Sequence, residues 1–446
     1  MARLFGTDGV RGIANTELTP ELAFRLGWAA AWYFGREQKK PAFLIGRDTR
    51  VSGQMLEAAL CAGICSAGGN ATVLGVIPTP GVAWLTSSSD AAAGVVISAS
   101  HNPFGDNGIK FFSGTGYKLP DAVEDELEEI VARGMETLPR PTGKSVGTIG
   151  YRHDRIAEYQ DFLCGTVKES LTGLRVVIDC ANGAACETAP AVLSRLGVNT
   201  EVLHCSPDGL NINDHCGSTH MESLQAAVLE RKADLGLAFD GDADRCLAVD
   251  EQGRLVDGDQ IMVILAHELI RQQTLRDNTL VATVMSNLGL HQAMRRVGGQ
   301  VMVTAVGDRY VLEAMQKHGL TLGGEQSGHI IFGEHSTTGD GLMTALQLLS
   351  SLKRNGSRLS ELGALMTRFP QVLVNVGVRS KAGWQENARI AAAVKAAEAE
   401  LGEDGRVLVR ASGTEPLIRV MAEGPDQGEL EKLAGEVAQV IRAELS

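Results

Sequence analysis

The chain has 446 residues, 44% of them hydrophobic, which is enough for two to four compact domains and too much for a disordered chain. It carries 41 basic and 54 acidic side chains, a formal net charge of -13, which disfavours nonspecific attraction to nucleic acid or to an anionic membrane. Any site for an anion must therefore be a local concentration of cations.

No apolar stretch approaches the roughly 20 residues that span a bilayer, and the first residues, up to Asp8, turn polar before a signal-peptide core can form. Eight cysteines form no C-x-x-C pair and occur mostly in apolar or turn contexts, as small core residues do in a reducing compartment. We therefore expect a cytoplasmic protein with no membrane or nucleic-acid partner, and neither zinc nor a disulfide framework is well supported.

Three segments share one plan: an apolar run, a loop of small polar residues, an amphipathic stretch, a glycine and a second β-branched run. They cover residues 43–74, 176–203 and 280–303. Strand, helix and strand of this length form a βαβ crossover, which belongs in a parallel or mixed sheet covered by helices. Ordinary α/β architecture and a true internal triplication both produce this pattern, and both predict an α/β fold for about the first 370 residues.

The C-terminal part follows a different plan and is predicted to be a small α+β domain. Strands are expected at 372–378, 406–410 and 417–422, and helices at 384–401 and 427–445. Domain boundaries are indicated by a Pro/Gly-rich stretch, a turn and a proline that ends the preceding helix, at 138–150, 251–253 and 369–370. The predicted fold is three similar α/β domains with mixed sheets and one α+β domain: 1–150, 151–255, 256–369 and 370–446.

The first polar loop, Ser98-Ala99-Ser100-His101-Asn102-Pro103, follows a strand expected at 93–97, at the carboxyl end where open α/β sheets place their ligands. A serine beside His101 can be a nucleophile, but the chain has no G-x-S-x-G elbow here, so an ordinary serine hydrolase is weakly supported. A polar turn is the alternative interpretation. Lys110, in the next short apolar run, places a cation near the same rim.

The second loop carries Asp240, Asp242 and Asp244 at alternate positions, followed by Arg245. Three carboxylates repel one another unless a cation collects them, and oxygen ligands favour a hard ion such as magnesium. An EF-hand is the rival, but Arg245 occupies the position that needs glycine, and the flanks 235–239 and 246–249 are typical of strands. The carboxylates are therefore expected at the tip of a hairpin.

Two further loops have the composition of ligand sites. Residues 323–329 include Glu325, Ser327 and His329, which can bind sugar hydroxyls where the glycines allow close approach, although a tight turn with a helix cap is the simpler interpretation. Residues 410–416 combine hydroxyls and main-chain N–H groups with Arg410, and Arg419 follows in the next strand. Such a loop can receive a dianion, and a decorated hairpin turn is the alternative.

The N-terminal loop, residues 5–12, is also rich in glycine and contains Arg11. Its glycine spacing matches neither a P-loop nor a dinucleotide fingerprint, so a nucleotide cofactor is unsupported. A serine, a magnesium site, a hydroxyl-binding loop and a phosphate receptor together predict phosphoryl transfer on a sugar phosphate.

The chain resembles the α-D-phosphohexomutase family. The resemblance covers essentially the whole chain, because four family motifs occur in the family's order at 98–103, 240–245, 324–329 and 410–416. Within the family it is closest to the bacterial branch that acts on glucosamine phosphates, through residues 5–12, 307–311 and 325–327. The resemblance implies four domains around a central cleft and an isomerase that interconverts glucosamine 6-phosphate and glucosamine 1-phosphate for cell-wall precursors.

The resemblance also implies roles for individual residues. Ser100, carried as phosphoserine, would donate its phosphoryl group to give glucosamine 1,6-bisphosphate, which turns over and returns the other phosphate. One Mg²⁺ would be held by Ser100 and the three aspartates, and general acid/base or electrostatic roles would fall to Arg11, His101 and Lys110 in a division that stays open. The substrate-binding residues implied are Arg245, Glu325, Ser327, His329, Arg410, Ser412, Gly413, Thr414 and Arg419.

Two other functions stay open from the sequence. A phosphoglucomutase or phosphomannomutase would use the same chemistry on a different sugar. A sugar-phosphate binding protein without activity is expected to have lost the donor serine or an aspartate, and all of these are present. The partners expected are small sugar phosphates, and a homodimer is expected from the family alone.

Overall fold

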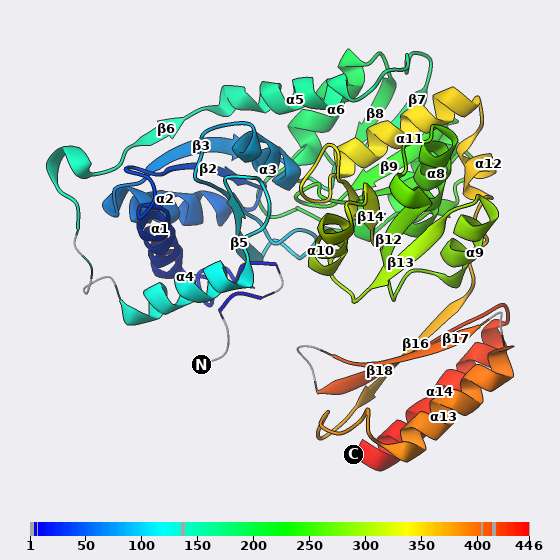
Figure 1. The fold of residues 1–446 in the computed structure, drawn as a ribbon. Helices are drawn as coiled ribbons and strands as arrows, with labels where there is room; N and C mark the ends of the chain where they lie inside the picture. Colours follow the sequence, from blue (N-terminus) through cyan, green and yellow to red (C-terminus); the bar gives the residue numbers. More distant parts are fainter. Residues whose placement is uncertain are drawn as a thin grey trace. The chain divides into compact units, whose positions relative to one another are not determined.

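The computed structural model describes residues 4–6, 8–134, 138, 140–402, 405–412 and 416–445. The chain forms two compact units, one of Met1–Met285 with Val297–Leu365 and the other of Ser286–Arg296 with Met366–Ser446. The first unit holds three mixed sheets and the second holds one antiparallel sheet of three strands (Figure 1). This confirms the predicted fold class, three α/β parts followed by an α+β part.

The first sheet has six strands in the order β1-β5-β4-β2-β3-β6. Its central strand β4 is an entirely buried apolar run, as expected for a strand covered on both faces. The elements of this part are β1 (Val10–Ile13), α1 (Pro20–Phe34), β2 (Ala42–Arg47), α2 (Gly53–Ser66), β3 (Asn70–Val76), α3 (Thr79–Ser87), β4 (Ala93–Ile97), β5 (Asp106–Ser113), α4 (Asp121–Arg133) and β6 (Ile149–Tyr151).

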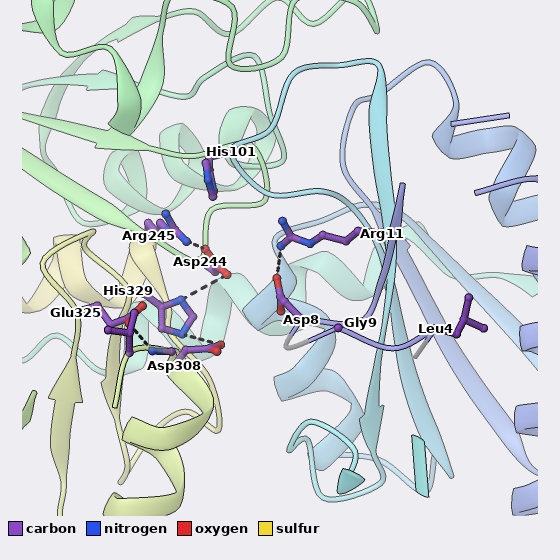
Figure 2. Close-up of a pocket in the computed structure, with 13 residues that line it drawn as sticks. Leu4, Asp8, Gly9, Arg11, His101, Asp244, Arg245, Asp308, Glu325 and His329 are labelled. Carbon is purple, nitrogen blue, oxygen red and sulfur yellow. Dashed lines mark hydrogen bonds and ion pairs between the residues drawn. The ribbon is translucent and has the colours of Figure 1, made fainter. Parts of the chain in front are cut away.

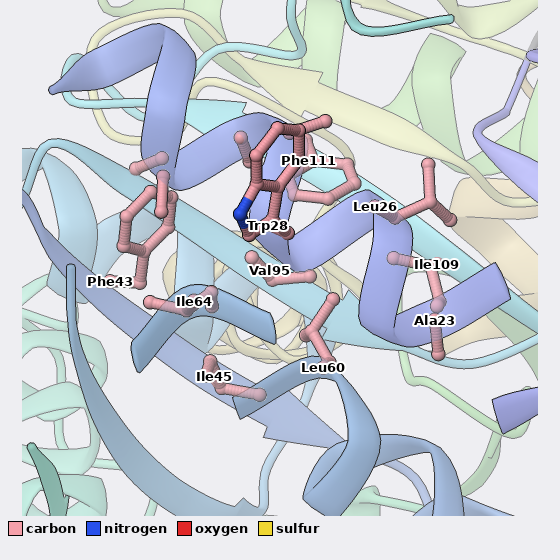
Figure 3. Packing of buried hydrophobic residues seen from close by; sticks show 14 of the residues in the cluster. Ala23, Leu26, Trp28, Phe43, Ile45, Leu60, Ile64, Val95, Ile109 and Phe111 are labelled. Atoms are coloured by element: carbon pink, nitrogen blue, oxygen red, sulfur yellow. The ribbon is translucent and has the colours of Figure 1, made fainter. Parts of the chain in front are cut away.

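Helices α1 and α2 pack on this sheet over a core that includes Trp28, Phe43 and Phe111 (Figure 3). The two helices approach very closely because Gly63 has no side chain, and a Cβ at that position would lie 2.0 Å from the carbonyl oxygen of Phe24. This packing fixes the sheet whose strand β4 leads into the first polar loop.

The second sheet has the order β11-β10-β9-β7-β8. Strands β9 and β10 form an antiparallel hairpin with Phe239 opposite Cys246, so the acidic loop lies at a hairpin tip as predicted. The elements are α5 (Ile156–Gly165), β7 (Arg175–Asp179), α6 (Ala185–Arg195), β8 (Asn199–Leu203), α7 (Glu222–Arg231), β9 (Leu235–Phe239), β10 (Cys246–Asp250) and β11 (Leu255–Val256).

The third sheet has the order β13-β12-β14-β15. Its first helix, α8, starts with a capping box in which Asp257 accepts from the main-chain N–H of Gln260 at 3.1 Å. The elements are α8 (Gly258–Arg271), β12 (Thr279–Thr283), α9 (Leu288–Arg296), β13 (Gln300–Thr304), α10 (Asp308–His318), β14 (Leu322–Gly324), β15 (Ile330–Phe332), α11 (Gly341–Asn355) and α12 (Leu359–Gly363).

The three sheets share one topology. Each repeat contributes four neighbouring strands. In the sheet, the second strand of the repeat lies beside the first, the first beside the third, and the third beside the fourth, and only the fourth strand runs antiparallel to its neighbour within the repeat. The three sets are β3-β2-β4-β5, β8-β7-β9-β10 and β13-β12-β14-β15. The repeated plan inferred from the sequence is therefore present as a repeated topology. In every repeat, the connection between the third and fourth strands carries one of the predicted loops, so the three loops are structurally equivalent.

The second unit is built from β16 (Gln371–Gly377), α13 (Ala388–Leu401), β17 (Arg406–Ala411), β18 (Leu417–Glu423) and α14 (Gln427–Leu445), with the strand order β16-β18-β17. Helix α13 begins four residues later than the sequence suggested, because the Asn387 side chain accepts from the N–H groups of Arg389 and Ile390 and caps it there. Helix α9 follows β12 of the third sheet in the sequence but packs with the second unit, where the main-chain N–H of Leu288 donates to Glu423 Oε1 at 2.8 Å.

Along the described part of the chain, every helix is too short or too polar to cross a membrane.

Candidate active site

Ser100 lies in the connection between β4 and β5 and is 1% exposed. Its backbone is left-handed, with φ of 51°, a conformation uncommon in residues other than glycine and frequent at functional sites. Its Oγ donates a hydrogen bond to Asp240 Oδ2 at 2.6 Å and lies 3.4 Å from Nδ1 of His101. The predicted nucleophile is therefore held against the acidic loop.

The Ser100 connection is held by a buried arginine that the sequence analysis missed. Arg50 is 1% exposed, and its Nε donates to Asp48 Oδ2 at 2.8 Å. Its two terminal nitrogens donate to four main-chain carbonyls of the connection, those of Ser100, Asn102, Pro103 and Asp106. An arginine three residues after a strand is ordinarily on the surface, so no signal in the sequence distinguished this one.

Two further side chains support the same serine. Ser98 donates to Asp48 Oδ2 at 2.6 Å and accepts from the main-chain N–H of Ser100 at 3.0 Å, so its hydroxyl has a structural role. Asn213, from the second domain, donates to the Ser100 carbonyl at 2.9 Å. These contacts give the two serines of the motif different roles, because Ser100 presents its hydroxyl to the acidic loop and Ser98 presents its hydroxyl to Asp48.

The three aspartates predicted to bind magnesium converge. Carboxylate oxygens of Asp240, Asp242 and Asp244 all lie within 4.8 Å of one another, and all three residues are buried. Burial and the neighbouring charges of Asp244 and Asp242 raise the pKa of Asp240 well above its usual range. Asp242 Oδ1 and Asp244 Oδ1 are buried without a hydrogen-bond partner among the described residues. Unpartnered buried carboxylate oxygens at this spacing fit a hard divalent cation.

Gly241 is required in this loop because of the Ser100 connection. A Cβ at Gly241 would lie 2.6 Å from the main-chain oxygen of Ser100, so a larger residue would separate the serine from the aspartates. The glycine thus permits the contact between Ser100 and Asp240.

Lys110 is a buried cation between two carboxylates. Its Nζ lies 3.0 Å from Asp8 Oδ2 and 3.1 Å from Asp242 Oδ2. Although burial opposes its charge, Asp242 and Asp8 raise the pKa of Lys110 above its ordinary value. Lys118, which the sequence analysis did not select, lies close by, with its Nζ 2.7 Å from Asp8 and 2.5 Å from Asp308. Lys118 therefore links the N-terminal loop to the third domain.

His101 has the opposite electrostatic environment. Burial and the nearby cations Arg245 and Arg11 lower the pKa of His101 to about 4. The imidazole is consequently neutral near pH 7, and a neutral imidazole can accept a proton.

The third loop supplies two side chains to the same region. Glu325 accepts from the main-chain N–H of Gly307 at 3.0 Å, and His329 lies between Asp244 and Asp308, with Nδ1 3.4 Å from Asp244 Oδ2. The main-chain N–H of Gly339 donates to His329 Nε2 at 3.0 Å, which leaves the Nδ1 proton facing Asp244.

Part of this set lines a cavity of about 440 Å³, within the range of sites for small molecules (Figure 2). Residues from all three α/β domains line it. Six of the predicted site residues are in the wall: Arg11, His101, Asp244, Arg245, Glu325 and His329. Five other predicted residues of these domains lie outside this lining: Ser100, Lys110, Asp240, Asp242 and Ser327.

The second unit contains the fourth predicted loop. Arg410 on β17 lies directly opposite Arg419 on β18. Burial and Arg419 lower the pKa of Arg410, and like charges in this register are unfavourable unless an anion joins them. Ser412 is 5% exposed, and its carbonyl accepts a hydrogen bond from Lys381 Nζ at 2.6 Å. Lys381 is therefore a third cation near this loop, and the sequence did not indicate it. Gly413 and Thr414 lie outside the described residues.

Four family models match consecutive parts of the chain. Models of the phosphoglucomutase/phosphomannomutase α/β/α domains I, II and III match residues 2–138, 154–253 and 257–369, and the model of the C-terminal domain matches 373–440. The chain belongs to the phosphoglucomutase/phosphomannomutase family, and the resemblance seen in the sequence is confirmed.

Individual relatives are similar over their full length. The phosphoglucosamine mutase of Symbiobacterium thermophilum is 59% identical, with 100% of both chains covered, and that of Moorella thermoacetica is 57% identical, with 99% of both covered. A solved phosphoglucomutase/phosphomannomutase family protein from Burkholderia thailandensis is 25% identical, with a TM-score of 0.81 over 99% of this chain and 97% of that one. The N-acetylphosphoglucosamine mutase of Aspergillus fumigatus, solved with GlcNAc-6P and magnesium, shares the fold at 19% identity and a TM-score of 0.70, with 99% and 96% covered.

Proposed function

We propose that this chain catalyses the phosphoglucosamine mutase reaction, interconverting glucosamine 6-phosphate and glucosamine 1-phosphate for amino-sugar nucleotide and cell-wall precursor synthesis. Relatives that are 53–59% identical over at least 98% of their length carry the name of this activity. The observation that carries the proposal is the buried Ser100 hydroxyl, which lies 2.6 Å from Asp240 and belongs to the residue before His101, a residue of the cavity wall.

In the proposed reaction, Ser100 is carried as phosphoserine and transfers its phosphoryl group to the free hydroxyl of the sugar phosphate. The P–O bond to Ser100 breaks, a P–O bond to the sugar forms, and glucosamine 1,6-bisphosphate results. After the bisphosphate turns over in the cavity, its other phosphoryl group returns to Ser100. The proton of the attacking hydroxyl needs an acceptor, and His101 is suited to this because its imidazole is neutral near pH 7.

The cations of the site supply electrostatic stabilisation. Lys110 holds its proton between Asp8 and Asp242, so it acts as a fixed positive charge near the transferred group. Arg11 and Arg245 line the cavity and face the same region. We assign Glu325, Ser327 and His329 to the sugar hydroxyls, with support from the cavity wall for Glu325 and His329.

The acidic loop fits one magnesium ion. Asp240, Asp242 and Asp244 would hold it with an oxygen on Ser100, and the unpartnered Oδ1 atoms of Asp242 and Asp244 support this. Bound there, the ion would neutralise charge that develops on the phosphoryl group during transfer.

We assign the phosphate that is not being transferred to the loop of the second unit. Arg410, Ser412, Gly413, Thr414 and Arg419 form this proposed receptor, and the opposed guanidiniums of Arg410 and Arg419 support it. Since the bisphosphate presents either phosphate to the same receptor, the receptor is expected to serve both sugar phosphates equally. The expected homodimer stays a prediction for sedimentation to test.

The test is a substrate comparison with the purified protein, magnesium and a catalytic amount of the matching 1,6-bisphosphate. We expect kcat/KM for glucosamine 6-phosphate to exceed those for glucose and mannose 6-phosphates, and a higher value for either neutral sugar would favour phosphoglucomutase or phosphomannomutase activity. Peptide mapping by mass spectrometry is expected to find the phosphate on Ser100.

Two variants separate catalysis from binding alone. Ser100→Ala is expected to abolish turnover and the phosphopeptide while the thermal midpoint is kept. Ser113→Ala, at the far end of β5, is the matched control and is expected to keep both. A Ser100→Ala variant with full turnover would remove the phosphoserine from the mechanism, and an unsubstituted protein that binds sugar phosphates without turnover would be a binding protein.

A further inference from the structure

Three cysteines that have no part in the proposed catalysis converge in the second domain. The Sγ atoms of Cys180, Cys186 and Cys205 all lie within 4.8 Å of one another. The sequence analysis expected core cysteines, and Cys180 is fully buried, whereas Cys186 and Cys205 are partly exposed. The group of these three residues is called the thiol cluster below.

The fold brings the three thiols together through adjacent strand ends. Cys180 follows the last residue of β7, and Cys205 lies two residues beyond β8, which is the parallel neighbour of β7 with Asp179 opposite Leu203. Cys186 is the second residue of α6. The two connections meet at the carboxyl edge of the sheet, and the first turn of the helix closes the third side.

The thiols of Cys186 and Cys205 make weaker hydrogen bonds than the neighbouring Asp179 carboxylate does. Cys205 Sγ donates to the carbonyl of Cys186 at 3.2 Å, and Cys186 Sγ donates to the carbonyl of His204 at 3.8 Å. Asp179, in a neighbouring group with His204 and Cys216, is already engaged by the main-chain N–H of Ala181 and by His204 Nδ1, both at 2.9 Å. The thiol cluster is therefore the set whose ligand atoms are available.

The spacing suits a soft cation. Metal–thiolate bonds of about 2.3 Å place three sulfurs of a trigonal set about 4.0 Å apart. An equilateral triangle of 4.8 Å sulfur separations reaches that size when each sulfur moves inward by about 0.5 Å. Thiolates select zinc-like ions, whereas carboxylates select magnesium, so this cluster and the aspartate loop differ in the ions that they prefer.

We propose that the thiol cluster is a binding site for one thiophilic d10 cation, such as Zn²⁺ or Cd²⁺, and that its occupancy is transmitted to the Ser100 connection. Because Cys186 and Cys205 are partly exposed, an ion can reach the cluster from solvent, and three sulfur ligands would leave a fourth position for water. Metal binding at the thiol cluster does not require that the proposed mutase function is correct.

Transmission follows from the connection that begins at Cys180. The carbonyl of Ala181 accepts from the main-chain N–H of Asn213 at 2.9 Å, and the Asn213 side chain donates to the Ser100 carbonyl. The main-chain N–H of Ala184 donates to the Gly241 carbonyl at 2.8 Å. A shift of the thiols therefore displaces a segment that contacts the aspartate loop directly and the Ser100 connection through Asn213.

Binding is tested with Cd²⁺ added to the reduced, magnesium-saturated protein, by following thiolate-to-cadmium absorbance in the ultraviolet. We expect the absorbance to saturate at one Cd²⁺ per chain, and to be lost in Cys205→Ser and in Cys180→Ser. Cys205→Ser is decisive if the buried Cys180→Ser fails to fold, because Cys205 is partly exposed. Cys164→Ser, a partly exposed cysteine outside the cluster, and Asp242→Asn are controls expected to keep the absorbance. Absence of the absorbance, or its persistence in Cys205→Ser, overturns the site.

Transmission is tested by hydrogen exchange with one equivalent of Cd²⁺. Peptides covering residues 98–106 are expected to change their exchange rate severalfold in the unsubstituted protein and to stay unchanged in Cys205→Ser. Unchanged exchange in the cadmium-saturated unsubstituted protein overturns the transmission.

Discussion

Replacing Arg50 by lysine tests whether a buried guanidinium holds the Ser100 connection in its working geometry. Two terminal nitrogens of Arg50 reach four main-chain carbonyls, at 2.9 Å for Ser100, 2.8 Å for Asn102 and 3.0 Å for Asp106. Lysine keeps the charge that Asp48 requires, but its three donors radiate from one nitrogen and cannot span these carbonyls.

The magnitude follows from the contacts that are lost. If two of the four carbonyls lose their partner, the cost is about 2–6 kcal/mol, at about 1–3 kcal/mol for each buried group left unsatisfied. The hydroxyl of Ser100 sits 2.6 Å from Asp240, so relaxation of the connection by about 1 Å breaks that contact. A misplacement of about this size costs roughly 100-fold in rate, which corresponds to about 2.7 kcal/mol.

The assay is steady-state mutase kinetics together with thermal unfolding. We expect kcat to fall about 100-fold while KM changes less than about threefold, because the cavity wall that contacts the sugar is unaltered. Arg47→Lys is the matched control, since the Arg47 guanidinium pairs with Glu57 at 3.3 Å and donates to the Asp48 carbonyl instead. A kcat within twofold of the unsubstituted protein, with an unchanged thermal midpoint, would refute the positioning role of Arg50.

Three further variants address the metal, the phosphate receptor and pH. Asp242→Asn is expected to raise the magnesium concentration for half-maximal activity at least tenfold, because one ligand charge is lost, and full activity in excess chelator would contradict the metal site. Arg410→Ala is expected to raise KM about tenfold for glucosamine 1-phosphate and 6-phosphate alike, and an effect confined to one isomer would contradict a shared receptor with Arg419. Burial raises the pKa of Asp340 from 3.8 to about 6, so the folded state binds this proton more tightly than the unfolded state does. The folded state therefore loses up to about 3 kcal/mol of stability as the pH rises from about 4 to about 6. Asp340→Asn, which keeps the helix cap, is therefore expected to gain in thermal midpoint relative to the unsubstituted protein over that range, and a constant difference between pH 4 and 7 would argue against the shift.

Much of the secondary structure of this protein could be predicted from the sequence, because it depends on neighbouring residues. The acidic triplet with strand-like flanks indicated a hairpin tip, and β9 and β10 form that hairpin. The prediction succeeded because a short apolar run on each side of a polar loop is a signal contained within a few residues. The helix expected at 427–445 has those bounds in the structure. Helix α13 begins four residues later than expected, since the side chain of Asn387 caps it there. The roles of the site residues stay predictions.

Tertiary structure decided which side chains meet. Arg50 supports Ser100 across 50 positions of the chain and Asn213 does so across 113, and no local sequence pattern predicts contacts over such separations. The thiol cluster arises in the same way: Cys180 and Cys205 are separated by a helix and a strand, and they meet because parallel pairing of β7 with β8 aligns the carboxyl ends of both strands. Sequence periodicity determines strands and helices, but the register of the sheet determines which loop residues become neighbours.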